Sequence, residues 1–181
     1  MRAAPGAEQR RLVGAGRCRR GYVVEGLGAA QFATPAAVDR LRSYAPDKQD
    51  PGVMPTGLVL AATDPANPYG AALPWPTRAE EAGGHRPGRK AGALVVLVAG
   101  ALVLYVERGG RTLLSWPDDP ALLAVAARSL SQAVTAGWLG RMTVETADGA
   151  SALSPSSPLG QALESAGFHA SPQGLRLRPT D

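Results

Sequence analysis

The 181-residue sequence has few of the residues that disulfides and metal sites need. Its single cysteine, Cys18, excludes a disulfide within the chain and any zinc site with several cysteine ligands. The two histidines, His85 and His169, lie far apart and do not have the spacing of metal ligands on a helix. We therefore expect no bound metal, and the lone cysteine fits a reducing compartment such as the cytoplasm.

Long apolar runs are also scarce. The most apolar one, residues 93–106, has 14 residues. A transmembrane helix needs about 20. Arg2 is not followed by the apolar segment of a secretory signal peptide. The sequence thus predicts no membrane association and no export, and we expect a cytoplasmic location.

The motifs of common catalytic sites are missing as well. No G-x-S-x-G motif, S-x-x-K motif or cysteine–histidine pair marks a nucleophile. Residues 83–91 are rich in glycine and basic residues, but they lack the hydroxyl residue of a P-loop and precede an expected strand. Two interpretations stay open for this loop: a solvated loop, or one that contacts a phosphate backbone through Arg86, Arg89 and Lys90.

Positive charge is concentrated in the first quarter of the chain. Residues 1–45 hold eight arginines against three acidic residues, whereas the rest of the chain is nearly neutral. Such a segment fits an anionic partner such as nucleic acid, and a solvated basic face is the alternative. The residues that we expect to contact DNA in this segment are Arg17, Arg19, Arg20, Arg40 and Arg42.

The order of predicted elements in this segment is that of the end of a winged helix. A short helix is followed by a basic hairpin over 17–33, with a glycine turn at 26–28. Thr34 then caps a helix that has Pro35 at its first position. We predict a partial winged helix over 1–45, in which the hairpin is a wing that contacts phosphates.

The remainder of the chain is predicted to be a separate module. Residues 46–56 are proline-rich and aperiodic, which is typical of a linker. Helices are expected after Asp118 or Asp119 and after Ser157. Strands are predicted at 57–64, 93–98, 101–108, 111–116, 141–148 and 174–178. The fold class predicted for 57–181 is α+β, a small antiparallel β-barrel or sheet with two packed helices.

A proline-rich loop after the first of these strands holds a candidate catalytic site, Asp64, Asn67 and Tyr69. Base excision from DNA needs a carboxylate that stabilises a cationic sugar or activates water, and an aromatic surface that receives a flipped base. The alternative is structural, with Asx turns at Asp64 and Asn67 and with Tyr69 and Trp75 in the core. An enzyme would need Asp64 at the rim of a cleft that faces the basic hairpin.

Long tracts in collinear order resemble the C-terminal end of the bacterial large helicase-related (Lhr) proteins. These tracts are residues 15–42, 59–76, 85–116 and 157–178. The resemblance implies a parent ATP-dependent DNA helicase, whose N-terminal motor uses ATP and magnesium. It also implies a C-terminal extension of winged helices that ends in a β-barrel module similar to that of AlkZ-type DNA glycosylases.

The departures from the family concern its chemistry. The sequence has no Walker A lysine, Asp-Glu-x-His box or arginine-finger motif, so we expect no ATP hydrolysis and no cofactor in this chain. The paired glutamines of AlkZ-type enzymes have no match, so a glycosylase activity rests on analogy. The upstream helices of the winged helix are missing too, and we expect a fragment or the product of a split gene.

The function that we expect is DNA binding by an accessory module of a DNA-repair helicase. The expected partners are single-stranded DNA, or duplex DNA with a single-stranded tail, and the helicase core of the same or a split protein. The alternatives are a base-excision module, a structural cap of the parent protein and an inactive fragment.

Overall fold

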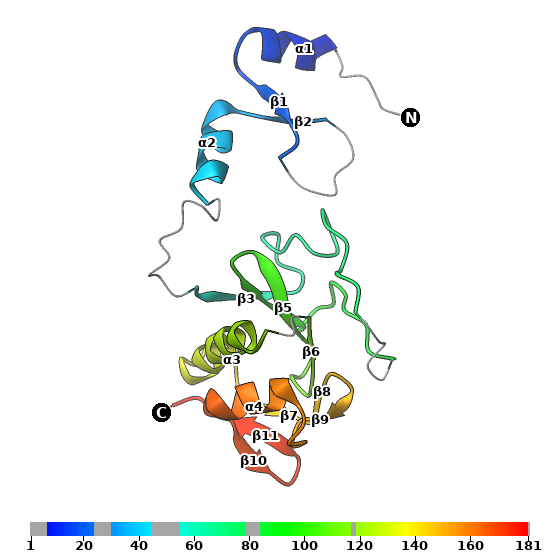
Figure 1. Cartoon of the computed structure of the whole chain (residues 1–181), viewed down its shortest axis with the longest axis vertical. Helices are drawn as coiled ribbons and strands as arrows, with labels where there is room; N and C mark the ends of the chain where they lie inside the picture. The colour runs from blue at the N-terminus through cyan, green and yellow to red at the C-terminus, as the bar shows by residue number, and fades with distance from the viewer. Residues whose placement is uncertain (1–6, 24–29, 45–54, 79–83, 117–118, 181) are drawn as a thin grey trace. The chain divides into compact units, whose positions relative to one another are not determined.

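The computed structural model describes residues 7–23, 30–44, 55–78, 84–116 and 119–180. The chain divides into two compact units, residues 1–54 and 55–181 (Figure 1). Most of the expected linker, 46–56, lies outside the described residues, so its boundaries stay a prediction.

The first unit consists of two short helices and a two-stranded hairpin. Its described elements are α1 Ala7–Gly14, β1 Arg19–Gly21, β2 Gln31–Ala33 and α2 Pro35–Ser43. The strands are antiparallel, with Arg20 opposite Phe32. The Oγ1 of Thr34 accepts the N–H of Ala37 at 3.3 Å, and Pro35 takes a position where no N–H is needed. The expected helix–hairpin–helix order is confirmed, while the turn expected at 26–28 lies outside the described residues.

None of the described side chains of the first unit is buried. Tyr22 is 69% exposed, and on and beside α2 Leu41 is 51% and Tyr44 64% exposed. The described part of this unit therefore presents both its apolar and its basic side chains at the surface.

The second unit has two sheets and two helices. Its elements are β3 Gly57–Ala61, β4 Leu94–Val98, β5 Ala101–Val106, β6 Thr112–Ser115, α3 Pro120–Thr135, β7 Met142–Val144, β8 Thr146–Ala147, β9 Ala150–Ser151, α4 Pro158–Ser165, β10 His169–Ser171 and β11 Gly174–Leu177. In the described residues, the larger sheet has the order β3-β4-β5-β6-β8-β9 and the smaller one β10-β11-β7. The α+β class with two helices is confirmed, but the described strands form open sheets and no closed barrel.

The expected meander is present as β4, β5 and β6. Ala99 and Gly100 join β4 to β5 with φ angles of 49° and 84°. Positive φ at both central residues is the geometry of the type I′ turn, which matches the twist of a hairpin. The one parallel pair among the described strands is β6 with β8, in which Thr112 lies opposite Thr146. Because of this pair, the larger sheet contains both parallel and antiparallel strands, whereas an antiparallel sheet was predicted from the sequence.

Both faces of β4 and β5 are covered, which explains the continuous apolar run at 93–106. On one face α3 packs Ala126, Leu130 and Val134 into the same cluster as Val96 and Leu104. The opposite face carries a second cluster, to which loops contribute: Ala62, Ala93, Val95, Leu97, Leu102, Tyr105 and Leu114, with Leu60, Tyr69, Trp75 and Trp116 packed against it. A strand buried on both faces has no polar side to alternate with.

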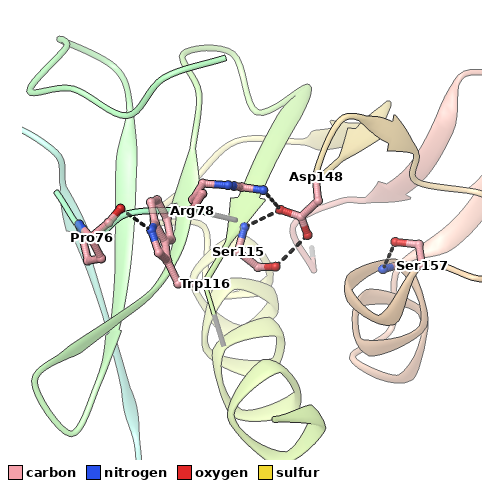
Figure 2. Close-up of polar contacts among 7 residues, drawn as sticks. Pro76, Arg78, Ser115, Trp116, Asp148 and Ser157 are labelled. Atoms are coloured by element: carbon pink, nitrogen blue, oxygen red, sulfur yellow. Dashed lines mark hydrogen bonds and ion pairs between the residues drawn. The ribbon is translucent and has the colours of Figure 1, made fainter. Parts of the chain in front are cut away.

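A half-buried carboxylate joins three segments of the second unit (Figure 2). Asp148, in the β8–β9 turn, accepts the N–H and the hydroxyl of Ser115, each at 2.6 Å, and forms an ion pair with Arg78 at 2.7 Å. The Arg78 guanidinium lies 5.5 Å from the ring centroid of Trp116, whose indole N–H donates to the carbonyl of Pro76 at 2.8 Å. Loop 76–78, β6 and the β8–β9 turn are therefore held together.

We expect Asp148→Asn to lower the free energy of unfolding by about 2–3 kcal/mol, because it breaks a partly buried ion pair. Asparagine tolerates the positive φ of 53° at this position, so backbone strain adds little. The measurement is urea unfolding followed by tryptophan fluorescence, which reports only on the second unit because all three tryptophans lie there. Exposed Glu164→Gln is the matched control, and equal stability of both variants would contradict the structural role.

Candidate nucleic-acid interface

The basic hairpin and α2 form one open hollow in the first unit. Its volume is about 410 Å³, and its lining residues are Arg19, Arg20, Gly21, Tyr22, Val23, Val38, Leu41 and Arg42. The structure thus brings together three of the arginines that the sequence assigned to DNA contact. These exposed arginines share the hollow with the apolar side chains of Val38 and Leu41 on α2, a composition suited to an anion with a flat apolar part.

The other two arginines of that set, Arg17 and Arg40, are exposed but do not line the hollow. Arg40 and Arg42 lie in the last turn of α2, where positive charge is favourable next to the carbonyl end of the helix dipole. Arg42 also lies 3.5 Å from the carboxylate of Asp39. Because both partners are exposed, that pair is weak and leaves Arg42 able to contact a ligand.

Tyr22 is the residue in this hollow that the sequence reasoning missed. This residue is 69% exposed and lines the hollow together with Arg19 and Arg20 of the hairpin. An exposed aromatic ring beside basic side chains is a surface on which an unpaired base can stack. The available signal was a tyrosine two residues after a pair of arginines, in "RRGY".

Arg89, assigned to the phosphate-contacting loop of the second unit, makes framework contacts. Its Nη1 donates to the carbonyls of Asn67 at 2.8 Å and Tyr69 at 3.4 Å, and its Nη2 to those of Thr63 at 2.8 Å and Asp64 at 3.1 Å. These bonds fasten the loop that follows β3 to the basic loop. The guanidinium is thus largely occupied by the protein itself.

The other two basic residues of that loop are more exposed. Lys90 donates to the carbonyl of Arg86 at 3.1 Å and lies 3.7 Å from the carboxylate of Glu107. The hydroxyl of Tyr105, whose pKa is raised by burial, donates to the carbonyl of Gly88 at 3.1 Å and ties the loop to β5. Phosphate contact by Arg86 and Lys90 stays a prediction.

The candidate catalytic residues also hold loops in place. Asn67 is 1% exposed, and its side chain donates to the carbonyl of Ala62 at 2.9 Å and accepts the N–H of Tyr69 at 3.1 Å. The Tyr69 hydroxyl donates to the carbonyl of Gly100 and accepts the N–H of Leu102, both at 3.2 Å. These contacts are those of the structural alternative.

Asp64 forms the expected Asx turn, in which its Oδ1 accepts the N–H of Ala66 at 2.8 Å. Its second oxygen has no hydrogen bond within the described part of the chain. The Tyr69 ring stacks on Trp75 with centroids 6.3 Å apart, and Trp75 meets Tyr105 edge-on at 5.7 Å. The aromatic pair therefore belongs to the core cluster, and a catalytic role for the three residues stays a prediction.

Two further properties concern the described ranges alone. No helix there is long and apolar enough to cross a membrane. No group of three or more histidine, cysteine, aspartate or glutamate side chains is placed there to hold a metal ion.

Comparison with known proteins assigns the basic hairpin to a domain family. Residues 9–53, which include the hairpin and α2, match the family described as "Large helicase-related protein, winged-helix domain". The predicted partial winged helix, 1–45, thus overlaps this winged-helix family over residues 9–45.

Two curated proteins match over most of the chain. One, from Mycolicibacterium smegmatis, is described as "Lhr helicase/ probable uracil glycosylase"; it is 52% identical over 169 residues, 91% of this chain and 11% of that protein. The other, from Escherichia coli K12, is described as "Lhr helicase/uracil glycosylase"; it is 38% identical over 167 residues, 92% of this chain and 10% of that protein.

The chain therefore spans about a tenth of the length of the curated relatives that it matches. The winged-helix match and both relatives agree with the resemblance seen in the sequence. On these grounds the chain belongs to the large helicase-related (Lhr) family and corresponds to the C-terminal region of its members.

Proposed function

We propose that this chain is a DNA-binding module of an Lhr-type helicase, whose wing contacts the phosphate backbone. The observation that carries the proposal is the hollow between β1 and α2. It gathers Arg19, Arg20 and Arg42 around Tyr22 inside the residues that match the winged-helix family. Arginines in such a place neutralise phosphates and release counterions, which gives affinity without sequence preference.

The exposed ring of Tyr22 adds a preference for unpaired bases, because a base within a duplex cannot stack on a side chain. The proposed ligand is therefore single-stranded DNA, or a duplex with a single-stranded tail. A motor elsewhere in the same or a partner protein would move the DNA while this module holds it. A role in DNA repair and a location in the cytoplasm belong to the same proposal.

ATP and magnesium are proposed only for such a motor. A P-loop places phosphates at the N-terminus of a helix, whereas the glycine-rich loop here leads into strand β4. Arg89 in that loop is bonded to backbone carbonyls. This loop therefore lacks the geometry of a P-loop for a nucleoside triphosphate, and no step of the proposed function uses one.

Base excision is the second candidate function, and the names of the two relatives favour it. Both names include a uracil glycosylase. In this chain Asp64 has one carboxylate oxygen that its Asx turn does not use, which could stabilise positive charge on a deoxyribose. Asn67 and Tyr69 would act by fixing that carboxylate, since their own polar groups are bonded to the backbone.

For DNA binding, we expect the variant Arg17→Gln/Arg19→Gln/Arg20→Gln to bind DNA at least tenfold more weakly at low salt. The slope of log K against log[salt] should fall by about 2–3, because each neutralised phosphate contributes about 0.7–0.9 to it. Fluorescence anisotropy of the full chain with single-stranded and duplex DNA measures both. The control is Arg10→Gln/Arg108→Gln/Arg128→Gln, which removes the same charge from other positions. If the control binds DNA as weakly as the wing variant, the loss of affinity comes from net charge and not from the wing.

For base excision, we expect the full chain to release uracil from a single-stranded oligonucleotide and Asp64→Asn to reduce the rate at least 100-fold. Asparagine keeps the oxygen that accepts the N–H of Ala66, so the loop should stay folded. Product release is measured by cleavage at the abasic site, with Glu164→Gln as the control. Absence of uracil release by a chain that binds DNA, or full activity of Asp64→Asn, would remove this candidate.

A further inference from the structure

The smaller sheet of the second unit has two contrasting faces. Its inward side chains belong to the core: Met142, Val144, Leu175 and Leu177. The residues between them point to the opposite face because successive side chains of a strand alternate. That outer face therefore carries Thr143 on β7 and Arg176 on β11, with Arg141 and Arg178 directly beyond the strand ends.

The register of this sheet places like charges next to each other. Arg176 lies opposite Thr143 on β7 and opposite His169 on β10. One further step of the same antiparallel register puts Arg178 opposite Arg141. Like charges opposite each other across a sheet destabilise it, so packing alone does not account for this pair.

The electrostatics of Arg176 follow from these neighbours. The positive charge of Arg178, then burial, then the positive charge of Arg141 lower the pKa of Arg176. Its Nε is buried and finds no acceptor in the described part of the chain. At least one N–H group of this guanidinium is thus left without a hydrogen-bond acceptor among the described residues.

An open pocket lies on this outer face. Its volume is about 370 Å³, and its lining residues are Gly109, Arg111, Arg141, Thr143, Glu145, Gln173 and Arg176. The one acid in this lining, Glu145, forms an ion pair with Arg111 at 3.3 Å. Within the described ranges, no carboxylate forms an ion pair with Arg141, Arg176 or Arg178. The pocket therefore has an excess of positive charge, with the hydroxyl of Thr143 and the amide of Gln173 as further donors.

A second hollow of about 400 Å³ adjoins the first along β11. His169, Ser171, Arg176 and Arg178 are among its lining residues, and Arg176 is common to both hollows. Two neighbouring anionic groups on one chain could therefore share this arginine. Among the described residues, no Phe, Tyr or Trp lines either hollow, and the imidazole of His169 is the one aromatic ring there, so the face is better suited to phosphates than to stacking bases.

We infer that this outer face is a second nucleic-acid contact, in which Arg141, Arg176 and Arg178 bind successive phosphates of a DNA backbone. Arginine suits this role because its planar fork donates two hydrogen bonds to one phosphate. The inference rests on the proposed DNA-binding function only for the source of the phosphates, and it is independent of the wing. Each of the two units of the chain would then have a DNA contact of its own.

The test compares the full chain with the variant Arg141→Gln/Arg176→Gln by anisotropy with single-stranded and duplex DNA across a salt series. We expect at least tenfold weaker binding at low salt and a salt slope smaller by about 1.4–1.8, because each of the two lost phosphate contacts contributes about 0.7–0.9 to the slope. The control Arg108→Gln/Arg128→Gln removes the same charge from exposed positions outside the pocket. Equal effects of the two variants would overturn the inference.

Thermal unfolding separates a binding role from a structural one. We expect the Tm of Arg141→Gln/Arg176→Gln to be unchanged or raised, since the substitutions relieve repulsion between like charges. A lowered Tm together with DNA affinity equal to that of the control would show that the arginines stabilise the sheet, and this would overturn the inference. A third outcome is that inorganic phosphate raises the Tm of the unmutated chain but not of Arg141→Gln/Arg176→Gln, while both bind DNA equally well. That result would show that the pocket binds a free anion and not DNA, and it would also overturn the inference.

The wing variant distinguishes this inference from the proposed function. Full DNA affinity of Arg17→Gln/Arg19→Gln/Arg20→Gln, with weak binding by Arg141→Gln/Arg176→Gln, would reject the wing and support the pocket. The opposite pattern would reject the pocket and support the wing. Weaker binding by each variant, with effects that add in the combined variant, would support both sites, and no DNA binding by the folded, unmutated chain would reject both.

Discussion

The carboxylate of Asp148 is the interaction on which the arrangement of the second unit depends. It fixes the end of β6 through Ser115 and draws Arg78 onto the ring of Trp116. Asp148 follows β8, and only Glu145 separates β8 from β7, so the ion pair also restrains the point where the chain passes from the smaller sheet to the larger one. The hydroxyl of Ser157 caps the short helix α4 by accepting the N–H of Gly160 at 3.0 Å (Figure 2). The carbonyl of Ala152 lies so close to Gly160 that a side chain there would collide with it.

The arginines of this chain divide into those that the protein uses internally and those that it presents to a ligand. Arg78 and Arg89 are bonded to a carboxylate or to backbone carbonyls, and each holds a loop against the core. Arg19 and Arg176 line open hollows instead. Composition and local sequence do not separate these classes, because the acceptors of Arg89 lie 20 to 26 residues away along the chain. Only the folded contacts show which positive charges are left to contact a ligand.

Local rules predicted most of the elements from the sequence. Thr34, Asp119 and Ser157 each precede a proline and cap a helix, because the capping bond and the fixed φ of proline act within a few residues. Non-local pairings were not predictable in this way: the parallel β6–β8 pair and the placement of β11 between β10 and β7 depend on register across the fold. The basic pocket was missed for the same reason, since Arg141 and Arg176 are neighbours only in the sheet. The arginines of the wing could be assigned to DNA contact because they cluster in sequence, but the hollow that three of them line was not predicted.

The mixed sheet also has a consequence for how the second unit folds. The β4–β5 hairpin closes over a two-residue turn, so it can form early and at little entropic cost. The β6–β8 pair joins Thr112 to Thr146, and the whole of α3 lies between them. That pairing must wait until α3 has packed on the sheet, since the intervening chain is otherwise free to keep the strands apart. The rate of folding should therefore be limited by the docking of α3, and the β8–β9 turn with Asp148 should be among the last parts to become ordered.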